Sequence, residues 1–281
     1  MGNVRMMTLL LGLLLFCHAY EPATRAPVIR FPVYIESTDA FGVAFYATYP
    51  VLLERSINQQ IGRADGRLRS VKLMKFRSAA RLGDAMLFES SARGSLRFIN
   101  EETREEHFNA KGVELAEHAL LIHRNAVVLP SHRLHVSRHT IYPDEYQPSY
   151  ERGALLLNTR TVFNLLERGR TDALGGPRRL SLAAASAGHV YVARISDFER
   201  ISDIPREDVL QASSTEVTVL TQAELLGDTM VDFTQQLVHG ADPGGAHGRL
   251  LVVARVTCCS VNAKTGKPVP FDEELRSVFL S

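Results

Sequence analysis

Apolar residues along this chain follow helical spacing in two segments and strand-like patterns in most of the others. Residues 28–37 are rich in β-branched and aromatic residues, which predicts a strand. Residues 45–61 carry apolar side chains at helical spacing and are followed by Gly62, a common helix terminator, so we expect a helix there. Further strands are expected in the first half of the chain at 70–80, 85–92, 95–100 and 115–129.

The second half repeats this order of elements. A strand is predicted at 133–142 and a helix at 161–174, where Gly175 and Gly176 end the helical pattern. More strands are expected after this helix at 190–195, 215–223, 229–239 and 250–261. A single apolar helix followed by many strands is an α+β pattern, and an antiparallel sheet that curves around the helix would bury both.

Two short echoes in the sequence support an internal repeat. Leu-Leu-Glu-Arg occurs in both predicted helices, and Leu-Gly-Asp occurs between strands in both halves, at 82–84 and 226–228. The two echoes lie further apart in the second half, which predicts an insertion at about 177–209. We therefore expect two related domains, 27–131 and 132–281, and two unrelated α+β domains are the alternative.

Residues 1–26 have the pattern of a targeting or anchor segment. Arg5 precedes an apolar run and small residues follow it, as in a secretory signal. The run is shorter than an ordinary membrane-spanning helix. Because Glu21 is the only acidic residue before Glu36, a mitochondrial transit peptide is the alternative. We therefore expect an organellar or secretory protein.

Composition narrows the function classes. Hydrophobic residues make up 45% and charged residues 22% of the 281 positions, which excludes collagen-like, coiled-coil and wholly disordered chains. The formal net charge is +1, so no overall basic excess favours nucleic acid, and no nucleic-acid partner is expected.

No cofactor or metal is expected either. Cys17, Cys258 and Cys259 cannot form a disulfide framework, and the adjacent pair should face opposite sides of a strand. His132 and His135, in a cluster of five histidines that also holds His118, His123 and His139, should likewise face opposite sides, which argues against a metal site. The chain has no serine-hydrolase elbow, P-loop or dinucleotide fingerprint.

The segment 33–55 carries the most informative motif. A strand leads into an Asp-x-x-Gly-Val sequence and then into a helix rich in aromatic residues. The six positions in this register are Asp39, Gly42, Val43, Tyr49, Glu54 and Arg55. This segment resembles the hotdog-fold acyl-CoA thioesterases of the 4-hydroxybenzoyl-CoA type, and the resemblance covers 28–130. It implies a double hotdog, in which two curved antiparallel sheets each surround a central helix and pair as a pseudo-dimer.

The chemistry of a thioester fits this segment. Its leaving thiol has a pKa near that of cysteine, about 8.5, so the site needs no strong acid. It needs a carboxylate to attack the carbonyl or activate water, and donors for the oxyanion, often at a helix N-terminus. Asp39 is the expected nucleophile or general base, and capping of the helix is its alternative role. Gly42 and Val43 are expected to shape the site, and Tyr46 and Tyr49 to line it.

Some positions depart from the family pattern. Family members often carry His where Tyr46 stands, and some carry Tyr where Ile35 stands. A tyrosine can donate a hydrogen bond but cannot act as a base at neutral pH. Glu54 is a second carboxylate expected near the substrate, and an ion pair with an arginine is its alternative role. The second half offers no counterpart of Asp39, because the aligned residues are Arg152, Tyr146 or Gln147.

A basic run follows the first predicted helix, with only Asp65 opposing it between 63 and 81. Arg67, Arg69 and Lys72 are the residues that we expect to meet the phosphates of a nucleotide-bearing thiol. The alternative is a solvated loop and an edge strand that uses its charge against aggregation.

The function predicted on this basis is hydrolysis of an acyl thioester, acyl-CoA or another, in lipid metabolism. The alternative is a catalytically inactive hotdog subunit for binding or assembly. A dehydratase on the same fold usually needs a histidine near the helix start, and residues 28–60 contain none. Association of two chains through their sheets would give a homo-oligomer.

Overall fold

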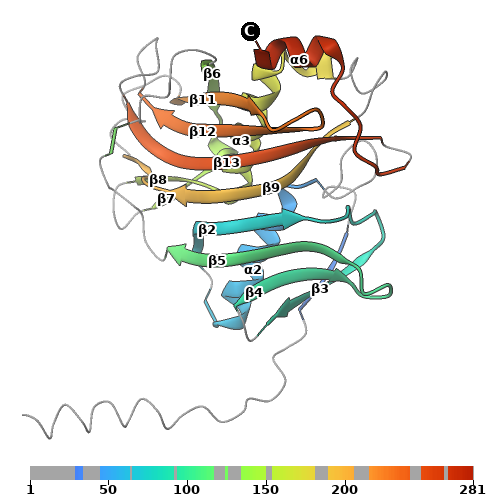
Figure 1. Cartoon of the computed structure of the whole chain (residues 1–281). Helices are drawn as coiled ribbons and strands as arrows, with labels where there is room; N and C mark the ends of the chain where they lie inside the picture. Colours follow the sequence, from blue (N-terminus) through green and yellow to red (C-terminus); the bar gives the residue numbers. More distant parts are fainter. Residues whose placement is uncertain are drawn as a thin grey trace, which may run out of the picture.

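The computed structural model contains a ten-stranded antiparallel sheet with two long helices on one face (Figure 1). A separate sheet of three short strands accompanies it. The structure describes residues 29–33, 45–63, 65–91, 94–116, 124–125, 134–149, 154–180, 189–205, 215–240, 248–262 and 265–280. Within these residues no helix is long and apolar enough to cross a membrane. The predicted targeting segment, 1–26, lies outside them.

The first half of the chain places five strands around one helix. Its elements are β1 (Ile29–Pro32), α2 (Thr48–Gln60), β2 (Arg67–Phe76), β3 (Ala85–Ser90), β4 (Ser95–Asn100) and β5 (Glu106–Ala116). The strands pair in the order β1-β3-β4-β5-β2. Aromatic rings fill the space between sheet and helix: Tyr49 of α2 stacks on Phe108 at 5.4 Å between ring centroids, with Phe98 beside them.

The second half uses the same plan with additions. Its elements are β6 (Leu134–Ile141), η2 (Pro143–Glu145), β7 (Tyr146–Ser149), β8 (Ala154–Leu157), α3 (Thr159–Ala173), β9 (His189–Arg200), β10 (Ile204–Pro205), β11 (Thr215–Leu225), β12 (Met230–His239), β13 (Arg249–Val261) and α6 (Glu273–Leu280). Five of its strands continue the large sheet in the order β9-β13-β12-β11-β6, and the small sheet has the order β10-β8-β7.

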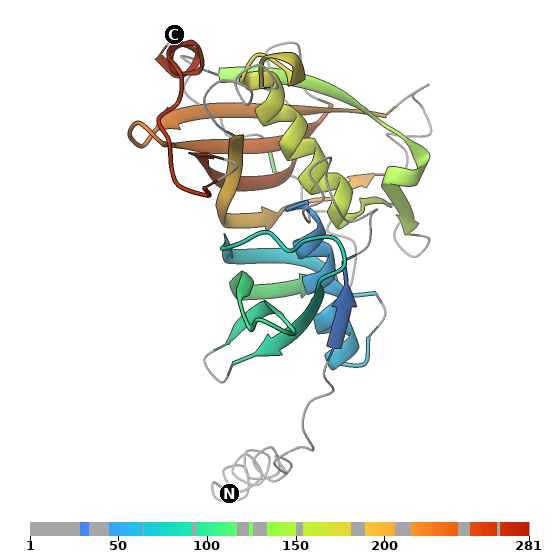
Figure 2. The same ribbon diagram turned by 90° about the vertical axis from the view of Figure 1, so that its right-hand side faces the viewer.

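The two halves meet where β2 pairs with β9. This antiparallel seam runs from Ser70 opposite Glu199 to Lys75 opposite Arg194. The strand order on one side of the seam mirrors the order on the other, and both helices lie on the same side of the sheet (Figure 2). The predicted fold, two curved antiparallel sheets around central helices joined as a pseudo-dimer, is confirmed.

Both helices bury equivalent faces against the sheet. Leu52 and Leu53 of α2 are buried, as are Leu165 and Leu166 of α3, which occupy the same places in the Leu-Leu-Glu-Arg echo. Each such burial contributes about 1.5–3 kcal/mol. Helix α3 comes closest to the sheet at Gly169, where an added Cβ would overlap Val219 on β11.

The predicted strand at 115–129 overlaps a strand of the structure only at 115–116, and 117–123 and 126–129 lie outside the described residues. The strand that completes the first half is β5, at Glu106–Ala116, and most of the residues after it lie outside the described residues. Its alternating pattern is weak because Gly112 interrupts it with a left-handed backbone, φ +60°. Five other elements were not predicted, because each is at most eight residues long and too short to show a periodic pattern: η2, β7, β8, β10 and α6.

The second echo and the predicted insertion also need correction. The first Leu-Gly-Asp joins β2 to β3, whereas the second joins β11 to β12, which correspond to β3 and β4 of the first half. The two sequences are therefore not equivalent. Residues 177–209 are not one insertion, because they include β9, the strand that forms the seam. The additional residues lie instead on both sides of β9.

Candidate functional site

The sequence predicts the reactive site just before helix α2. Three predicted site residues fall within 34–44 and so lie outside the described residues: Asp39, Gly42 and Val43. The structure places the N-cap of α2 at Ala47, eight residues beyond Asp39. Asp39 is therefore not the N-cap residue of this helix.

The first turn of α2 uses its own amide donors. The N–H of Thr48 donates to the carbonyl of Phe45 at 2.9 Å, and the N–H of Tyr49 donates to the carbonyl of Tyr46 at 3.2 Å. Pro50, the next residue, has no N–H. An oxyanion at this site would therefore take its donors from the connection that precedes the helix, rather than from the first turn of the helix.

Tyr46 connects the start of α2 to the other half of the molecule through hydrogen bonds. Its hydroxyl donates to the carbonyl oxygen of Phe163 at 2.9 Å and accepts a hydrogen bond from Nη2 of Arg170 at 2.7 Å. The Arg170 guanidinium also lies 5.5 Å from the centroid of the Tyr46 ring, within cation–π distance. Both partners belong to α3, so Tyr46 connects the two central helices.

These contacts decide what the Tyr46 hydroxyl can do. Burial raises the pKa of Tyr46 well above its usual value, although the charge of Arg170 acts in the opposite direction. The phenol therefore stays protonated at physiological pH, and its proton is donated to the Phe163 carbonyl. Tyr46 positions the helix and does not act as a base.

Tyr49 belongs to the aromatic core. It is 2% exposed, and its ring lies among Phe76, Phe98 and Phe108. Its hydroxyl accepts a hydrogen bond from the N–H of Ala80 at 3.2 Å, and burial raises its pKa to about 12. In the structure this side chain packs the helix against the sheet, whereas the sequence predicted that it lines the site.

Glu54 links three elements through hydrogen bonds, and the buried Arg200 lies within electrostatic reach of it. Its Oε2 accepts hydrogen bonds from the N–H of Leu68 at 2.7 Å and from the hydroxyl of Thr159 at 2.5 Å. Leu68 belongs to β2 and Thr159 is the first residue of α3. A carboxylate beside the N-terminus of a helix is also favoured by the helix dipole.

The same geometry recurs on the other side of the pseudo-twofold axis. Glu167 of α3 occupies the place that Glu54 has in α2, and Tyr46 precedes Glu54 by eight residues, as Thr159 precedes Glu167. Glu167 accepts a hydrogen bond from Arg170, which in turn donates to Tyr46. Each helix therefore presents a glutamate towards the start of the other helix, directly in one case and through an arginine in the other.

The connection before α3 forms part of a small sheet. The segment that corresponds to 34–44 forms β7 and β8, which pair with β10. Leu155 and Leu157 of β8 are buried, as is Ile204 of β10. Arg200, 2% exposed, donates to the carbonyl of Leu157 at 2.8 Å, and its Nη1 lies 3.7 Å from Asp203. In this half, packed side chains therefore occupy the place equivalent to the predicted site.

The three predicted phosphate-binding residues are separated in the structure. Arg67 is mostly buried and lies 3.5 Å from Asp203, whereas Arg69 and Lys72 are exposed. Their strand, β2, is fifth in the order of ten and is paired on both sides. The interpretation of this run as the charged edge of a sheet is therefore wrong.

Arg170, the residue that joins the two helices, was not predicted from the sequence. Arg170 is 2% exposed and donates to Gln235 Oε1 at 2.6 Å, to Tyr46 and to Glu167. Gln235, fully buried on β12, also donates to the carbonyl of Leu166 at 2.8 Å. The available signal was the position of Arg170 one residue after Gly169, on the face of α3 that is otherwise apolar.

The two described cysteines, Cys258 and Cys259, are free thiols on β13. Cys258 is buried and Cys259 is partly exposed, as expected for neighbours on a strand. Burial raises the pKa of the Cys258 thiol to about 12. No group of three His, Cys, Asp or Glu side chains suited to a metal ion occurs in the part of the chain that the structure describes.

Comparison with known proteins identifies the fold. No protein-family model matches the chain, and no curated protein matches it at a significant level. Three solved structures share the whole architecture at 8–9% sequence identity. A protein described as an oleoyl thioesterase from Lactobacillus plantarum has a TM-score of 0.54 and 8% identity, over 84% of this chain and 98% of that chain.

Two acyl-ACP thioesterases give similar values. The enzyme from Bacteroides thetaiotaomicron has a TM-score of 0.52 and 9% identity, over 83% of this chain and 97% of its own. The 12:0-ACP thioesterase from Umbellularia californica has a TM-score of 0.51 and 9% identity, over 83% and 98%. At such identities the likeness shows the fold alone, and the fold of this chain is the double hotdog.

Proposed function

We propose that this protein hydrolyses an acyl thioester at one site, formed by residues 34–44 together with the start of α2. The observation that carries the proposal is the combination of the double hotdog fold with the Asp39-x-x-Gly42-Val43 sequence, directly before a central helix that contacts the other half. The three solved structures compared above all bear the name thioesterase, which supports the same reaction class.

In the proposed mechanism Asp39 supplies the carboxylate. It attacks the thioester carbonyl or removes a proton from a water molecule that attacks it. The amide groups of Gly42 and Val43 stabilise the oxyanion, because the first turn of α2 uses its own donors internally. The thiolate leaves without a strong acid, since its conjugate thiol has a pKa of about 8.5.

The second half acts as a support for this site. Arg170 and the Phe163 carbonyl hold Tyr46, and therefore the end of the reactive segment, against α3. The equivalent segment of the second half is packed as a small sheet and lacks a carboxylate at the aligned positions. The proposal therefore assigns one site to each chain, with acyl-CoA or another acyl thioester as the substrate.

The test measures thiol release. The full chain is incubated with acyl-CoAs of increasing chain length and a chromogenic thiol reagent. We expect Asp39→Asn to lower kcat/KM at least about 100-fold, the usual cost of losing a catalytic carboxylate. Asp65→Asn, which changes an exposed aspartate beyond the other end of α2, is the matched control and should leave turnover unchanged.

The inactive-subunit alternative makes the opposite prediction. If the chain only binds or assembles, no acyl-CoA gives thiol release, or Asp39→Asn and Asp65→Asn retain the same rate. Either result contradicts the hydrolase proposal, provided that both variants keep the melting temperature of the unchanged protein.

A further inference from the structure

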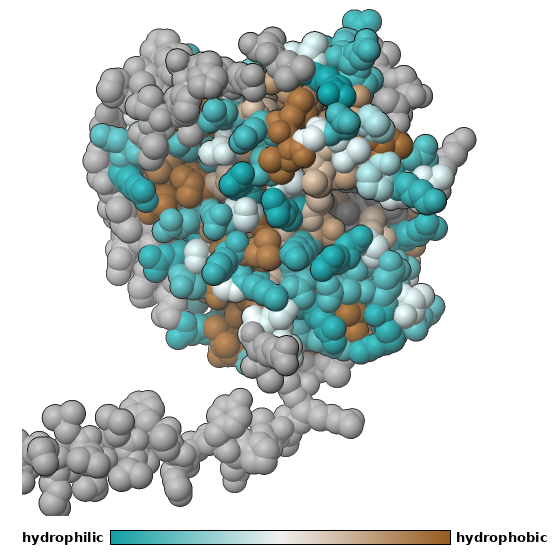
Figure 3. Space-filling view, viewed as in Figure 1, coloured by the Kyte–Doolittle hydropathy of each residue, from teal (hydrophilic) through white to brown (hydrophobic). Residues whose placement is uncertain are grey.

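Two adjoining grooves lie on the outer face of the sheet, the face opposite α2 and α3. One has a volume of about 310 Å³ and lies over β4, β5 and β2, and the other, of about 320 Å³, lies over β2, β9 and β13. Lys75 and Arg77 of the β2 region line both grooves. Figure 3 shows that hydrophilic side chains cover much of this face.

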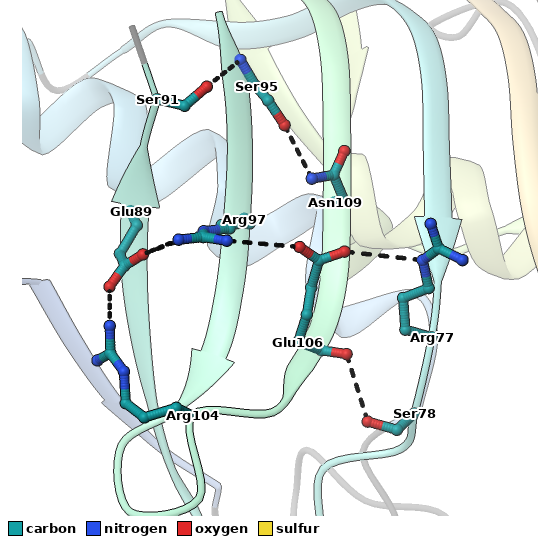
Figure 4. A network of polar contacts seen from close by, with 9 residues as sticks. All are labelled: Arg77, Ser78, Glu89, Ser91, Ser95, Arg97, Arg104, Glu106 and Asn109. Carbon is teal, nitrogen blue, oxygen red and sulfur yellow. Dashed lines mark hydrogen bonds and ion pairs between the residues drawn. The ribbon is translucent and has the colours of Figure 1, made fainter. Parts of the chain in front are cut away.

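Opposite charges alternate across this face as far as β2. Figure 4 shows Glu89 bound by Arg97 and Arg104, and Glu106 placed between Arg97 and Arg77. The carboxylate of Glu106 lies 3.7 Å from Arg77 and 3.9 Å from Arg97. The only acid that lines these grooves is therefore already balanced by two arginines.

The alternation stops at the seam between the halves. Lys75 of β2 stands directly opposite Arg194 of β9, and side chains opposite each other in an antiparallel pair point to the same face. Like charges in this position destabilise a sheet. In the described part of the chain neither of these cations forms a direct ion pair with a carboxylate. Arg194 donates to the hydroxyl of Thr257 at 2.8 Å, and this hydroxyl in turn donates to Asp232, whose carboxylate is already paired with Arg255. Lys111 adds a further positive charge to the first groove.

Protection of a sheet edge does not explain this arrangement. β2 and β9 are the two central strands of the ten, and each is paired on both sides. Solvation does not require it either, because alternating charges solvate the neighbouring strands equally well. A pair of cations in the middle of a sheet, each without a direct ion pair among the described residues, indicates a place where an anion can bind.

We propose that these grooves bind the phosphate groups of a small molecule, with Lys75 and Arg194 as the principal ligands. Arg77 and Lys111 lie on either side, and the hydroxyls of Ser91 and Ser95 supply neutral donors in the first groove. Two adjoining cationic grooves suit two linked phosphates, because phosphate oxygens take charge-assisted hydrogen bonds from arginine and lysine. The site lies across the sheet from the helices and is independent of the proposed hydrolase.

The experiment uses the full chain and measures binding by isothermal titration calorimetry at fixed ionic strength. The probes are inorganic pyrophosphate, ADP and adenosine, which separate the linked phosphates from the nucleoside. The test variant is Lys75→Gln/Arg194→Gln. The control is Arg138→Gln/Arg160→Gln, which removes the same charge from exposed residues of β6 and α3 that line neither groove.

We expect pyrophosphate and ADP to bind and adenosine alone not to bind. The test variant should weaken binding at least about 100-fold, from two charge-assisted contacts of roughly tenfold each, whereas the control should change it less than about threefold. Equal weakening in both variants would show only general attraction to positive charge and would overturn the proposal. Absence of binding, or binding of adenosine as tight as that of ADP, would overturn it as well.

Discussion

Replacing Arg170 by methionine tests whether the two helices depend on this buried charge. Methionine fills a similar volume but removes the hydrogen bonds to Gln235, Tyr46 and Glu167. Gln235 is fully buried and loses the donor to its Oε1, while Glu167 is about one-third exposed and can be solvated. Hydrogen bonds to a charged group contribute about 1.5–3 kcal/mol each, and relief of the desolvation of the arginine offsets part of this. We expect the free energy of unfolding to fall by about 2–4 kcal/mol.

Urea unfolding followed by circular dichroism measures this change. In a thermal scan the same loss corresponds to a decrease of roughly 5–15 °C in Tm. Arg168→Met is the control, because Arg168 is two residues away on the same helix but is largely exposed and bonds only Glu145 in the described contacts. Equal effects of the two substitutions, or a loss below about 1 kcal/mol for Arg170→Met, would refute the reasoning.

Three further predictions concern stability and reactivity. Gly169→Ala should destabilise the protein by about 1–3 kcal/mol, because the new methyl group would overlap Val219. Alanine normally stabilises a helix relative to glycine, so a higher Tm of the variant would contradict this prediction. Cys258, whose pKa is raised to about 12, should resist alkylation at pH 8 in the folded protein, while the partly exposed Cys259 reacts; peptide mass spectrometry distinguishes them. Glu54→Ala should lower the unfolding free energy by about 2–4 kcal/mol and Glu54→Gln, which keeps an acceptor oxygen, by clearly less, as measured in urea.

The regular elements were largely predictable because their side chains alternate between two environments. The predicted bounds of β4 agree with the structure, and both central helices lie within a few residues of their predicted positions. Each buries one face against the sheet, and this produces the periodic pattern that the sequence displays. The repeat of Leu-Leu-Glu-Arg marked equivalent turns of α2 and α3, because the same two leucines must be buried in each half.

Other parts depend on contacts that no local pattern records. Strand β5 is interrupted by Gly112, and the two-residue strand β10 exists only because it pairs with β8. The role of Tyr46 could not be predicted, since its partners Phe163 and Arg170 lie 117 and 124 residues away in the sequence. The family resemblance predicted a reactive segment at 34–44, whereas the partners of Tyr46, two residues after that segment, come from the other half of the chain.

The two halves satisfy one electrostatic requirement in different ways, and this explains why a covalent tandem differs from a homodimer. Each central helix points a glutamate at the start of the other, and a fully buried arginine accompanies each glutamate. Beside Glu167 the arginine is Arg170 of the same helix, whereas the position equivalent to Arg170 in α2 is Ile57. Beside Glu54 the positive charge comes instead from Arg200 at the end of β9, where burial lowers its pKa and Asp203 opposes that shift.

In a symmetric dimer an arginine at the Arg170 position would appear twice. The second copy, at the place of Ile57, would add a guanidinium to the helix that carries Glu54, where Arg200 already supplies a buried positive charge, and burying an unpaired charge costs several kcal/mol. Fusion of the halves removes this constraint, because each substitution is made once. The first half could therefore keep the connection that carries Asp39, while the second half filled the equivalent place with β7, β8 and the Arg200–Asp203 pair. Swapping the arginine from position 170 to position 57 should accordingly destabilise the protein more than losing it from position 170 alone.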